Sequence, residues 1–351
     1  MTEIGAVRCA FPAHRYRQAE LTEHVAKLSG VEPARQALLE RLHAHAGVDT
    51  RYTVLPLPEY GDLGGIGPAN DRYIELATAL GEQAISSALG AAGMAAADVD
   101  LLIVTSVTGV AVPSLDARLI PRLGLRPDVK RVPIFGLGCV AGATGLARLH
   151  DYLLGWPGHR AVLLAVELCS LTAPVDSSTT PDLVVSGLFG DGAAALVARG
   201  DRAAVGRGPR VIATRGEVVP GTEDVLGWRL DTGGFRIVLT ADLSSVVESH
   251  LGAGVSDFLA EHGLKIDDIT GWVCHPGGPK VIDAVQDSLG LPDSALELTR
   301  RSLAEVGNMS SASILHVLQQ TIDVGRPPPG SPGLLIGLGP GVSMELILLE
   351  W

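Results

Sequence analysis

The chain contains an internal repeat, offset by nearly half of its 351 residues. A shift of 170 residues, or of 169 for the last two pairs, aligns equivalent positions: Gly93 with Gly263, Asp98 with Asp268, Val99 with Ile269, Thr105 with His275, Gly138 with Gly307, and Cys139 with Asn308. Solenoid repeats have far shorter periods, so this offset indicates a duplicated domain. We therefore expect two related halves that pack about a pseudo-twofold axis.

Within the first half, predicted strands alternate with predicted helices. The continuous apolar runs at residues 99–107 and 161–171 are typical of strands covered on both faces. Residues 71–92 carry Ala and Leu at helical spacing, whereas the stretch 55–70, rich in Pro and Gly, is expected to be a surface loop. This alternation predicts a layered α/β fold.

The composition changes at residues 199–210, which we interpret as the connection between the two halves. We therefore predict an N-terminal domain over residues 1–205 and a C-terminal domain over residues 206–351. A chain of this length, 46% of it apolar, can bury a large core in two domains.

Charge and hydropathy exclude several classes of protein. The formal charge is −12 and no run of like charge occurs, which argues against a nucleic-acid-binding surface. The N-terminus lacks the pattern of a signal peptide, and no apolar run approaches the length of a membrane span. We expect a cytoplasmic protein without membrane insertion.

The four cysteines are scattered along the chain, without a CxxC pair and without a histidine at ligand spacing. Neither a disulfide framework nor a metal site is expected. Cys139 stands out because it follows glycines at the predicted start of a long helix, in GLGCVAG. The helix N-terminus would favour a thiolate there, so Cys139 is a candidate nucleophile. The alternative is a small buried hydrophobic residue packed against a neighbouring helix.

Two further residues are candidates for the same site. His275 follows a predicted buried strand and precedes a Pro-Gly turn, in WVCHPGGPK. Asn308 precedes a predicted helix, in EVGNMSSAS, where the alternative role is an N-cap. If the halves pack about a twofold axis, the two helix N-termini meet at the interface, and the strand end of His275 lies in the same neighbourhood.

The motifs GLGCVAG, LFGDGAAA, HPGGPK, GNMSSAS and GLGPG resemble, in order and spacing, those of the type III polyketide synthases, the chalcone-synthase-like branch of the thiolase fold. The resemblance covers nearly the whole chain. It implies duplicated αβαβα layered halves related by pseudo-twofold symmetry, a homodimer, and a catalytic triad of Cys139, His275 and Asn308. Within the family, the chain looks most like the actinobacterial alkylresorcinol synthases.

The resemblance implies a decarboxylative Claisen condensation. Cys139, as a thiolate paired with protonated His275, takes the acyl group of an acyl-CoA starter, expected to be a fatty acyl-CoA. Malonyl-CoA then loses CO2 beside His275 and Asn308, whose N–H groups stabilise the enolate. No metal or redox cofactor is needed. Ring closure to an alkylresorcinol or to an alkylpyrone, the starter length and the number of extensions stay open.

The family also implies substrate-binding residues. Phe189 and Phe235 match its two phenylalanines between the CoA tunnel and the chain cavity, and Ser310 belongs to the same substrate-binding set. Further positions replace residues that line the cavity of plant enzymes and argue against a chalcone-type product: Cys169, Thr172, Val107 and Val112. For the CoA phosphates, the implied cations are Arg41, His45 and Lys280, with His45 in place of a lysine.

Three other functions fit part of this pattern. A β-ketoacyl carrier-protein synthase of the initiating type shares the triad, but its histidine motif usually reads HQAN. A thiolase needs a second catalytic cysteine late in the chain, and none follows Cys274. A non-catalytic partner protein of the same fold would have lost its nucleophile, whereas Cys139 is present.

Overall fold

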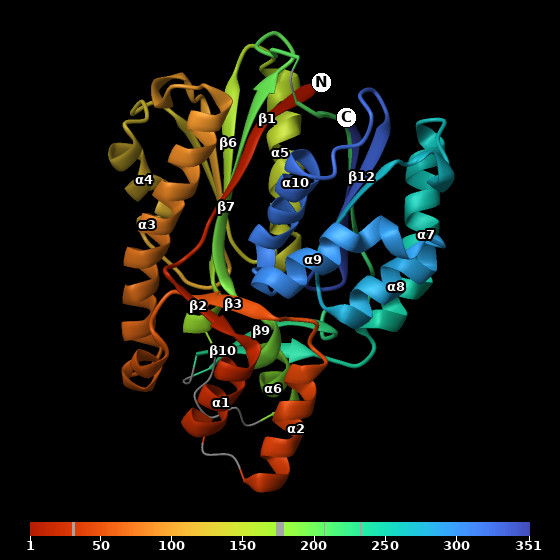
Figure 1. Ribbon diagram of the computed structural model, residues 1–351. Coiled ribbons are helices and arrows are strands. Elements are labelled where there is room, and N and C mark those ends of the chain that lie inside the picture. The colour runs from red at the N-terminus through yellow and green to blue at the C-terminus, as the bar shows by residue number, and fades with distance from the viewer. Residues whose placement is uncertain (30–31, 173–178, 207, 232–233) are drawn as a thin grey trace.

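The computed structural model describes residues 1–29, 32–172, 179–206, 208–231 and 234–351. Within these ranges, nine strands form one mixed sheet (Figure 1). From one edge to the other, the strands are β11 (Gly271–Cys274), β12 (Pro332–Gly339), β13 (Ser343–Glu350), β8 (Arg210–Val218), β1 (Thr2–Ala10), β7 (Asp191–Gly200), β6 (Arg160–Leu168), β4 (Leu101–Thr105) and β5 (Lys130–Ile134).

The strand pairing repeats between the two halves. In the first half, β1 pairs antiparallel with β7, β7 antiparallel with β6, and β6 parallel with β4. In the second half, β8, β13, β12 and β11 pair in the same sequence of directions. The halves join where Thr2 and Glu3 of β1 pair with Val211 and Arg210 of β8. Strand β5 lies outside this repeat and forms the edge of the first half.

Helices divide the molecule into layers (Figure 1). The central layer is α5 (Ala141–Gly155) with α10 (Ser313–Asp323), which share one buried cluster with the inner faces of both half-sheets. Helices α3 (Ile66–Ala92) and α4 (Leu115–Leu123) cover the outer face of the first half. Helices α7 (Leu243–Glu261) and α8 (Pro279–Leu289) cover that of the second. The result is the predicted αβαβα arrangement.

The apolar runs seen in the sequence follow from this layering. Strand β6 has a helical layer on both sides, so its alternate side chains enter different clusters. Leu163 packs with the central helices, and its neighbours Val162 and Leu164 pack with α3 and α4. A strand with both faces buried needs no polar positions, which is why the run is continuous.

A smaller region lies below the layers in Figure 1. From the first half it contains the hairpin of β2 (His14–Arg17) with β3 (Thr50–Thr53) and the helices α1 (Gln18–Ser29), α2 (Pro33–Ala44) and α6 (Thr180–Leu188). From the second half it contains the hairpin of β9 (Leu226–Asp231) with β10 (Gly234–Leu239). Helix α9 (Glu297–Val306) contacts β3 of this region and α10 of the central layer.

The predicted loop at residues 55–70 is only partly correct. Residues Leu57–Asp62 form a 3-10 helix, η1, and α3 already begins at Ile66. Pro68 lies in the first turn of α3, where the backbone N–H has no partner within the helix, so proline is tolerated there. The remaining 3-10 turns are η2 (Ala96–Asp98), η3 (Gly138–Val140), η4 (Cys169–Leu171), η5 (Ile266–Asp268), η6 (Asp293–Leu296) and η7 (Ser310–Ala312).

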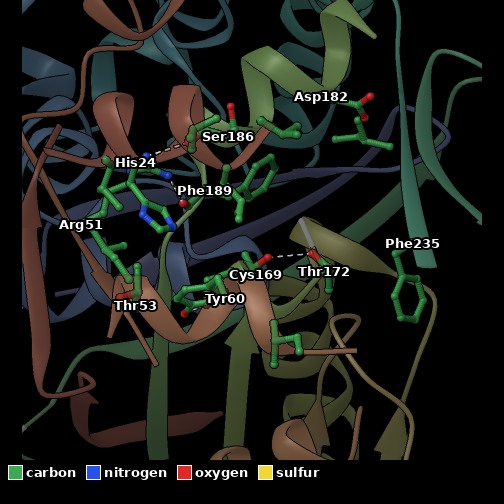
Figure 2. A pocket seen from close by; sticks show the side chains of 18 of the residues that line it. His24, Arg51, Thr53, Tyr60, Cys169, Thr172, Asp182, Ser186, Phe189 and Phe235 are labelled. Carbon is green, nitrogen blue, oxygen red and sulfur yellow. Dashed lines mark hydrogen bonds between the residues drawn. The ribbon is translucent and has the colours of Figure 1, made fainter. Parts of the chain in front are cut away.

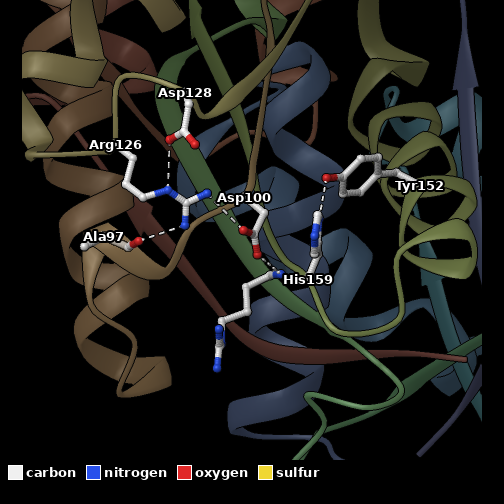
Figure 3. Close-up of polar contacts among 7 residues, drawn as sticks. Ala97, Asp100, Arg126, Asp128, Tyr152 and His159 are labelled. Atoms are coloured by element: carbon white, nitrogen blue, oxygen red, sulfur yellow. Dashed lines mark hydrogen bonds and ion pairs between the residues drawn. The ribbon is translucent and has the colours of Figure 1, made fainter.

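The Arg126 side chain joins the starts of three strands (Figure 3). The Arg126 guanidinium donates hydrogen bonds to Asp128, to Asp100 and to the carbonyl of Ala97 at 3.0–3.1 Å. Asp100 also accepts the backbone N–H of Arg160 at 2.9 Å. These contacts hold the starts of β4, β5 and β6 together. No helix in the described ranges has both the length and the apolar character needed to cross a membrane.

Candidate active site

Cys139 lies in η3, directly before α5, as the motif GLGCVAG predicts. The preceding Gly138 has a φ of +56°, and a Cβ at this position would come within 2.5 Å of Pro340. Only glycine fits both the backbone angle and the space. The Cys139 thiol donates to the hydroxyl oxygen of Ser310 at 3.6 Å, so a side chain of the second half contacts the thiol directly.

His275 follows β11, and its backbone N–H extends the pairing of that strand by bonding to the Ile336 carbonyl at 3.0 Å. The residue is 3% exposed. Its Nδ1 atom is buried and has no hydrogen-bond partner among the described residues. A buried imidazole nitrogen without a partner is costly, so it is available to a bound molecule.

Asn308 lies between α9 and η7 and does not cap α10, whose N-cap is Ala312. Its side-chain oxygen accepts the Ser310 backbone N–H at 2.8 Å and the Ser313 hydroxyl at 3.4 Å. The amide oxygen is therefore occupied. The two N–H donors of the amide make no hydrogen bond with the described residues and are free to meet a negatively charged oxygen.

One cavity brings these three residues together. The other lining residues are apolar or glycine, with one serine, and come mainly from the second half: Leu188, Phe189, Leu226, Ile237, Leu239, Leu243, Val247, Gly277, Val281, Leu338, Gly339, Val342 and Ser343. The predicted convergence of a thiol, an imidazole and an amide is therefore present in the structure. Such a set can form a thioester and hold an enolate.

Burial controls the protonation of the pair. Burial raises the pKa of Cys139 to about 12. The hydrogen bond to Ser310 lowers this pKa, and the charge of Glu167 raises it. Burial lowers the pKa of His275 to about 4. Burial thus favours a neutral thiol and a neutral imidazole in the free protein, whereas the thiolate and imidazolium expected from the sequence stay a prediction for the catalytic state.

Glu167 is a site residue that the sequence prediction missed. Its side chain is fully buried at the end of β6, and burial raises the pKa of its carboxyl. One oxygen accepts the Ser311 hydroxyl at 2.5 Å, and the other accepts the Val107 backbone N–H at 3.0 Å and the Thr108 hydroxyl at 2.9 Å. A single acidic residue within the apolar run AVLLAVEL was the available signal.

A second pocket adjoins the first, and Phe189 and Ile237 line both (Figure 2). Four predicted substrate-binding residues line it: Cys169, Thr172, Phe189 and Phe235. Helix α1 and the segment 51–63 contribute further lining residues that the sequence did not indicate: Leu21, His24, Val25, Leu28, Arg51, Thr53, Leu57, Tyr60 and Leu63.

Two predicted lining residues lie elsewhere. Val107 is buried and holds Glu167 through its backbone, but its side chain lines none of the pockets described above. Val112 is 91% exposed, in the loop between β4 and α4, and also lines neither pocket. Neither residue lines the two pockets of a single chain, so their substrate-binding role stays a prediction. Ser310 contacts Cys139 directly.

The predicted CoA-binding cations lie on two adjoining elements. Arg41 and His45 are exposed at the end of α2, and Lys280 is exposed in the first turn of α8. The chain at Gly47 packs against Pro279, which brings these two ends together. The His45 ring bonds to the Arg41 backbone carbonyl at 2.7 Å. This bond does not involve the Arg41 guanidinium or the Lys280 ammonium group, which are exposed to solvent and can meet an anion. Within the described residues, no group of His, Cys, Asp or Glu is arranged to hold a metal ion.

Comparison with known proteins identifies the family. The family model described as "Chalcone and stilbene synthases, N-terminal domain" matches residues 2–202, and the model of the corresponding C-terminal domain matches residues 210–350. A 1,3,6,8-tetrahydroxynaphthalene synthase of Streptomyces peucetius subsp. caesius is 56% identical, over 100% of this chain and 93% of the relative. The α-pyrone synthesis polyketide synthase-like Pks18 of Mycobacterium tuberculosis is 30% identical, over 99% of this chain and 90% of the relative.

Solved structures agree with this assignment. The crystal structure of 1,3,6,8-tetrahydroxynaphthalene synthase from Streptomyces coelicolor A3(2), a bacterial type III polyketide synthase, superposes with a TM-score of 0.94. It is 31% identical and the match covers 99% of both chains. The resemblance inferred from the motifs is thereby confirmed at the level of the family. The chain belongs to the chalcone and stilbene synthase family and is a type III polyketide synthase, a decarboxylative condensing enzyme.

Proposed function

We propose that this enzyme builds 1,3,6,8-tetrahydroxynaphthalene, or a closely related hydroxynaphthalene, from malonyl-CoA alone. A naphthalene skeleton has ten carbons, which five malonyl units supply after decarboxylation. The full-length relative with 56% identity, named for this product, carries the proposal. The cavity around Cys139 supports it, because it offers a nucleophile and enolate-stabilising donors without needing a second starter.

Each group at the site receives one role. His275 takes the proton of the Cys139 thiol as the sulfur attacks a CoA thioester, so the ion pair exists only during attack. Malonyl-CoA then decarboxylates with its thioester oxygen between the His275 imidazole and the Asn308 amide, which together act as an oxyanion hole. The enolate carbon attacks the acyl-Cys139 carbonyl, the bond between that carbonyl and the Cys139 sulfur breaks, and the lengthened chain is left as a CoA thioester that can be loaded onto Cys139 again.

The growing chain extends past Phe189 into the pocket that Phe235, Cys169 and Thr172 line. This assignment is supported by the position of Phe189 on the wall that both pockets share. Arg41, His45 and Lys280 bind the CoA phosphates at the surface, where the exposed ends of α2 and α8 adjoin. No metal or redox group has a part in these steps.

The second candidate is a synthase that starts from a fatty acyl-CoA and releases an alkylresorcinol or an alkylpyrone. It is favoured by the apolar lining that α1 gives to the second pocket, through Leu21, Val25 and Leu28. A hydrocarbon chain would gain from burial on these side chains. The relative Pks18 carries a pyrone-synthesis name, which keeps this candidate open.

One assay separates the two candidates. Purified enzyme is incubated with malonyl-CoA alone and with malonyl-CoA plus a series of acyl-CoA starters, and products are identified by mass spectrometry. We expect the hydroxynaphthalene from malonyl-CoA alone. A product that forms only when a fatty acyl-CoA is added would replace our proposal with the second candidate. A Cys139→Ala variant in parallel shows which products depend on the enzyme.

We further propose that the enzyme is a homodimer joined at the β5 edge. Within the part of the chain that the structure describes, β5 pairs only with β4, and exposed apolar side chains lie near it: Val132 on β5, Phe135 after it, and Leu154 and Trp156 at the end of α5. The Lys130 ammonium lies 3.8 Å from the Trp156 ring, so the two elements adjoin. An open edge beside an apolar patch favours pairing with a second chain. Sedimentation equilibrium giving a monomer mass would contradict this.

A further inference from the structure

The second pocket contains an imidazole that the family motifs do not assign to any role. His24 is on α1 and lines the pocket together with Leu21, Val25 and Leu28 of the same helix (Figure 2). Its three companions are apolar, so His24 is the polar group that α1 presents to this pocket.

The Nε2 atom of His24 is buried and makes no hydrogen bond within the described residues. Other buried histidines have partners: His43 contacts Thr22 and Ser186, and His316 contacts Ser302. Among the described residues, the histidine nitrogens buried without a partner belong to His24 and His275. One lines the Cys139 cavity and the other lines the adjoining pocket, which suggests that both face a bound molecule.

The charged groups around His24 are already engaged. The Arg51 guanidinium donates to the carbonyls of Phe189 and Ser186 and to the Gln18 side chain. Asp182 caps α6 through Thr179. Burial, with a smaller contribution from Lys27, lowers the pKa of His24. The imidazole is therefore neutral at neutral pH, with one nitrogen able to accept a proton.

We infer that His24 acts as a general base and acid in the ring closure of the extended polyketide. This inference rests on the proposed function, in which the chain enters this pocket. Nε2 takes a proton from a methylene group between two carbonyls, and the C–H electron pair becomes an enolate. The enolate carbon forms a bond to a carbonyl carbon of the same chain. The resulting alkoxide takes the proton back from His24, so no other reactant is consumed.

The test compares condensation with ring closure in the same reaction. His24→Leu removes the base, and His24→Gln keeps a hydrogen-bonding group that cannot take a proton. His250→Gln is the matched control, because His250 is exposed on α7 and lies outside the described pockets. Free CoA release measures condensation, and mass spectrometry gives the ratio of ring-closed aromatic product to uncyclised or lactone products.

A positioned base contributes about 100-fold or more to a proton transfer. We therefore expect His24→Leu to lower the product ratio by at least about tenfold, since some chains close unaided, while free CoA release stays close to that of the parent enzyme. His24→Gln should show the same loss, and it decides the question if the leucine variant does not fold. His250→Gln should leave both readouts unchanged.

Two results would overturn the inference. One is an unchanged product ratio in both His24 variants with normal CoA release, which would leave the proposed function intact. The other is loss of CoA release in both folded variants, which would assign His24 to condensation. Failure of the proposed function is a separate observation, because the parent enzyme itself would then release no aromatic product from malonyl-CoA alone.

Discussion

The two halves share a scaffold but treat equivalent positions differently. At the end of β4, Thr105 is fully buried and donates to the Ser311 hydroxyl at 3.3 Å, and Ser311 in turn donates to Glu167. The equivalent residue after β11 is His275, whose Nδ1 has no partner among the described residues. One strand end is closed by hydrogen bonds, and the other presents an unpaired nitrogen to a cavity.

The helix starts differ in the same way. Cys139 presents a thiol, whereas Asn308 uses its amide oxygen locally and leaves its N–H donors free. Each copy of the duplicated element thus offers a group that the other lacks, a thiol in one and amide N–H donors in the other. In the proposed mechanism these two groups serve the two steps, because the positions at which the copies differ meet in one cavity.

The largest effect should come from removing the thiol. Cys139→Ala should abolish covalent loading from radiolabelled malonyl-CoA and reduce condensation by at least about 10⁴-fold, the scale seen when a catalytic nucleophile or its base is disabled. Cys9→Ala is the control, since Cys9 lies outside the described pockets. Label that persists on the Cys139→Ala protein would assign the nucleophile to another residue.

Removing the Asn308 side-chain amide tests the second copy of the duplicated element. Asn308→Ala should slow malonyl decarboxylation by about 100-fold or more, as does the loss of one oxyanion-hole donor, because the enolate oxygen loses a partner. Loading of Cys139 should survive, as the thiol is in the other half. Measured CO2 release equal to that of the parent enzyme would remove Asn308 from the mechanism.

The pH dependence of Cys139 alkylation tests whether the Cys139 thiol and the His275 imidazole are both neutral in the free enzyme. Because burial holds the pKa of Cys139 near 12, the thiolate fraction in the free enzyme rises with pH throughout the neutral range. The rate of iodoacetamide labelling at Cys139 should therefore increase by about tenfold per pH unit between pH 7 and 9. A rate that is already constant across this range would mean that a thiolate and imidazolium pair exists before substrate binds.

The smallest effect should come from removing the hydrogen bond of Thr105 at the end of β4. Thr105→Val keeps the side-chain shape and removes the hydrogen bond to Ser311, so we expect a loss of about 1 kcal/mol in the free energy of unfolding and less than about a threefold change in condensation. Denaturant titration and CoA release measure the two quantities. A large loss of activity would show that Thr105 takes part in catalysis, against the contrast drawn between the strand ends.

The sequence was informative where a residue's role depends on local pattern. Cys139, His275 and Asn308 stand at element boundaries marked by glycine or proline, and the repeat placed them at one interface. The family assignment and the layered fold were predicted correctly, which answers the carrier-protein synthase alternative. The alkylresorcinol branch was not supported, since the 56% identical relative is named for a hydroxynaphthalene.

Features that depend on contacts between distant segments could not be predicted from the sequence. Nothing near His24 in the sequence distinguishes it from an exposed histidine on a polar helix, because its pocket is completed by residues from α6 and β10. Val112 illustrates the same limit, since its family position did not predict that its side chain is 91% exposed in a single chain. The protonation of Cys139 likewise depends on burial, which no motif encodes.

The wall between the two pockets is hydrogen-bonded to Asn308, the residue to which we assign the oxyanion-hole amide. Asn308 donates its backbone N–H to Leu188 and accepts that of Gly190, so the Phe189 backbone forms a bridge with it. A shift of the Phe189 backbone would therefore displace Asn308 and, in the proposed mechanism, the amide that stabilises the enolate. Substitutions in α1 and η4 can therefore change the shape of the second pocket without moving the backbone that joins Phe189 to Asn308, so product choice and condensation can be altered separately.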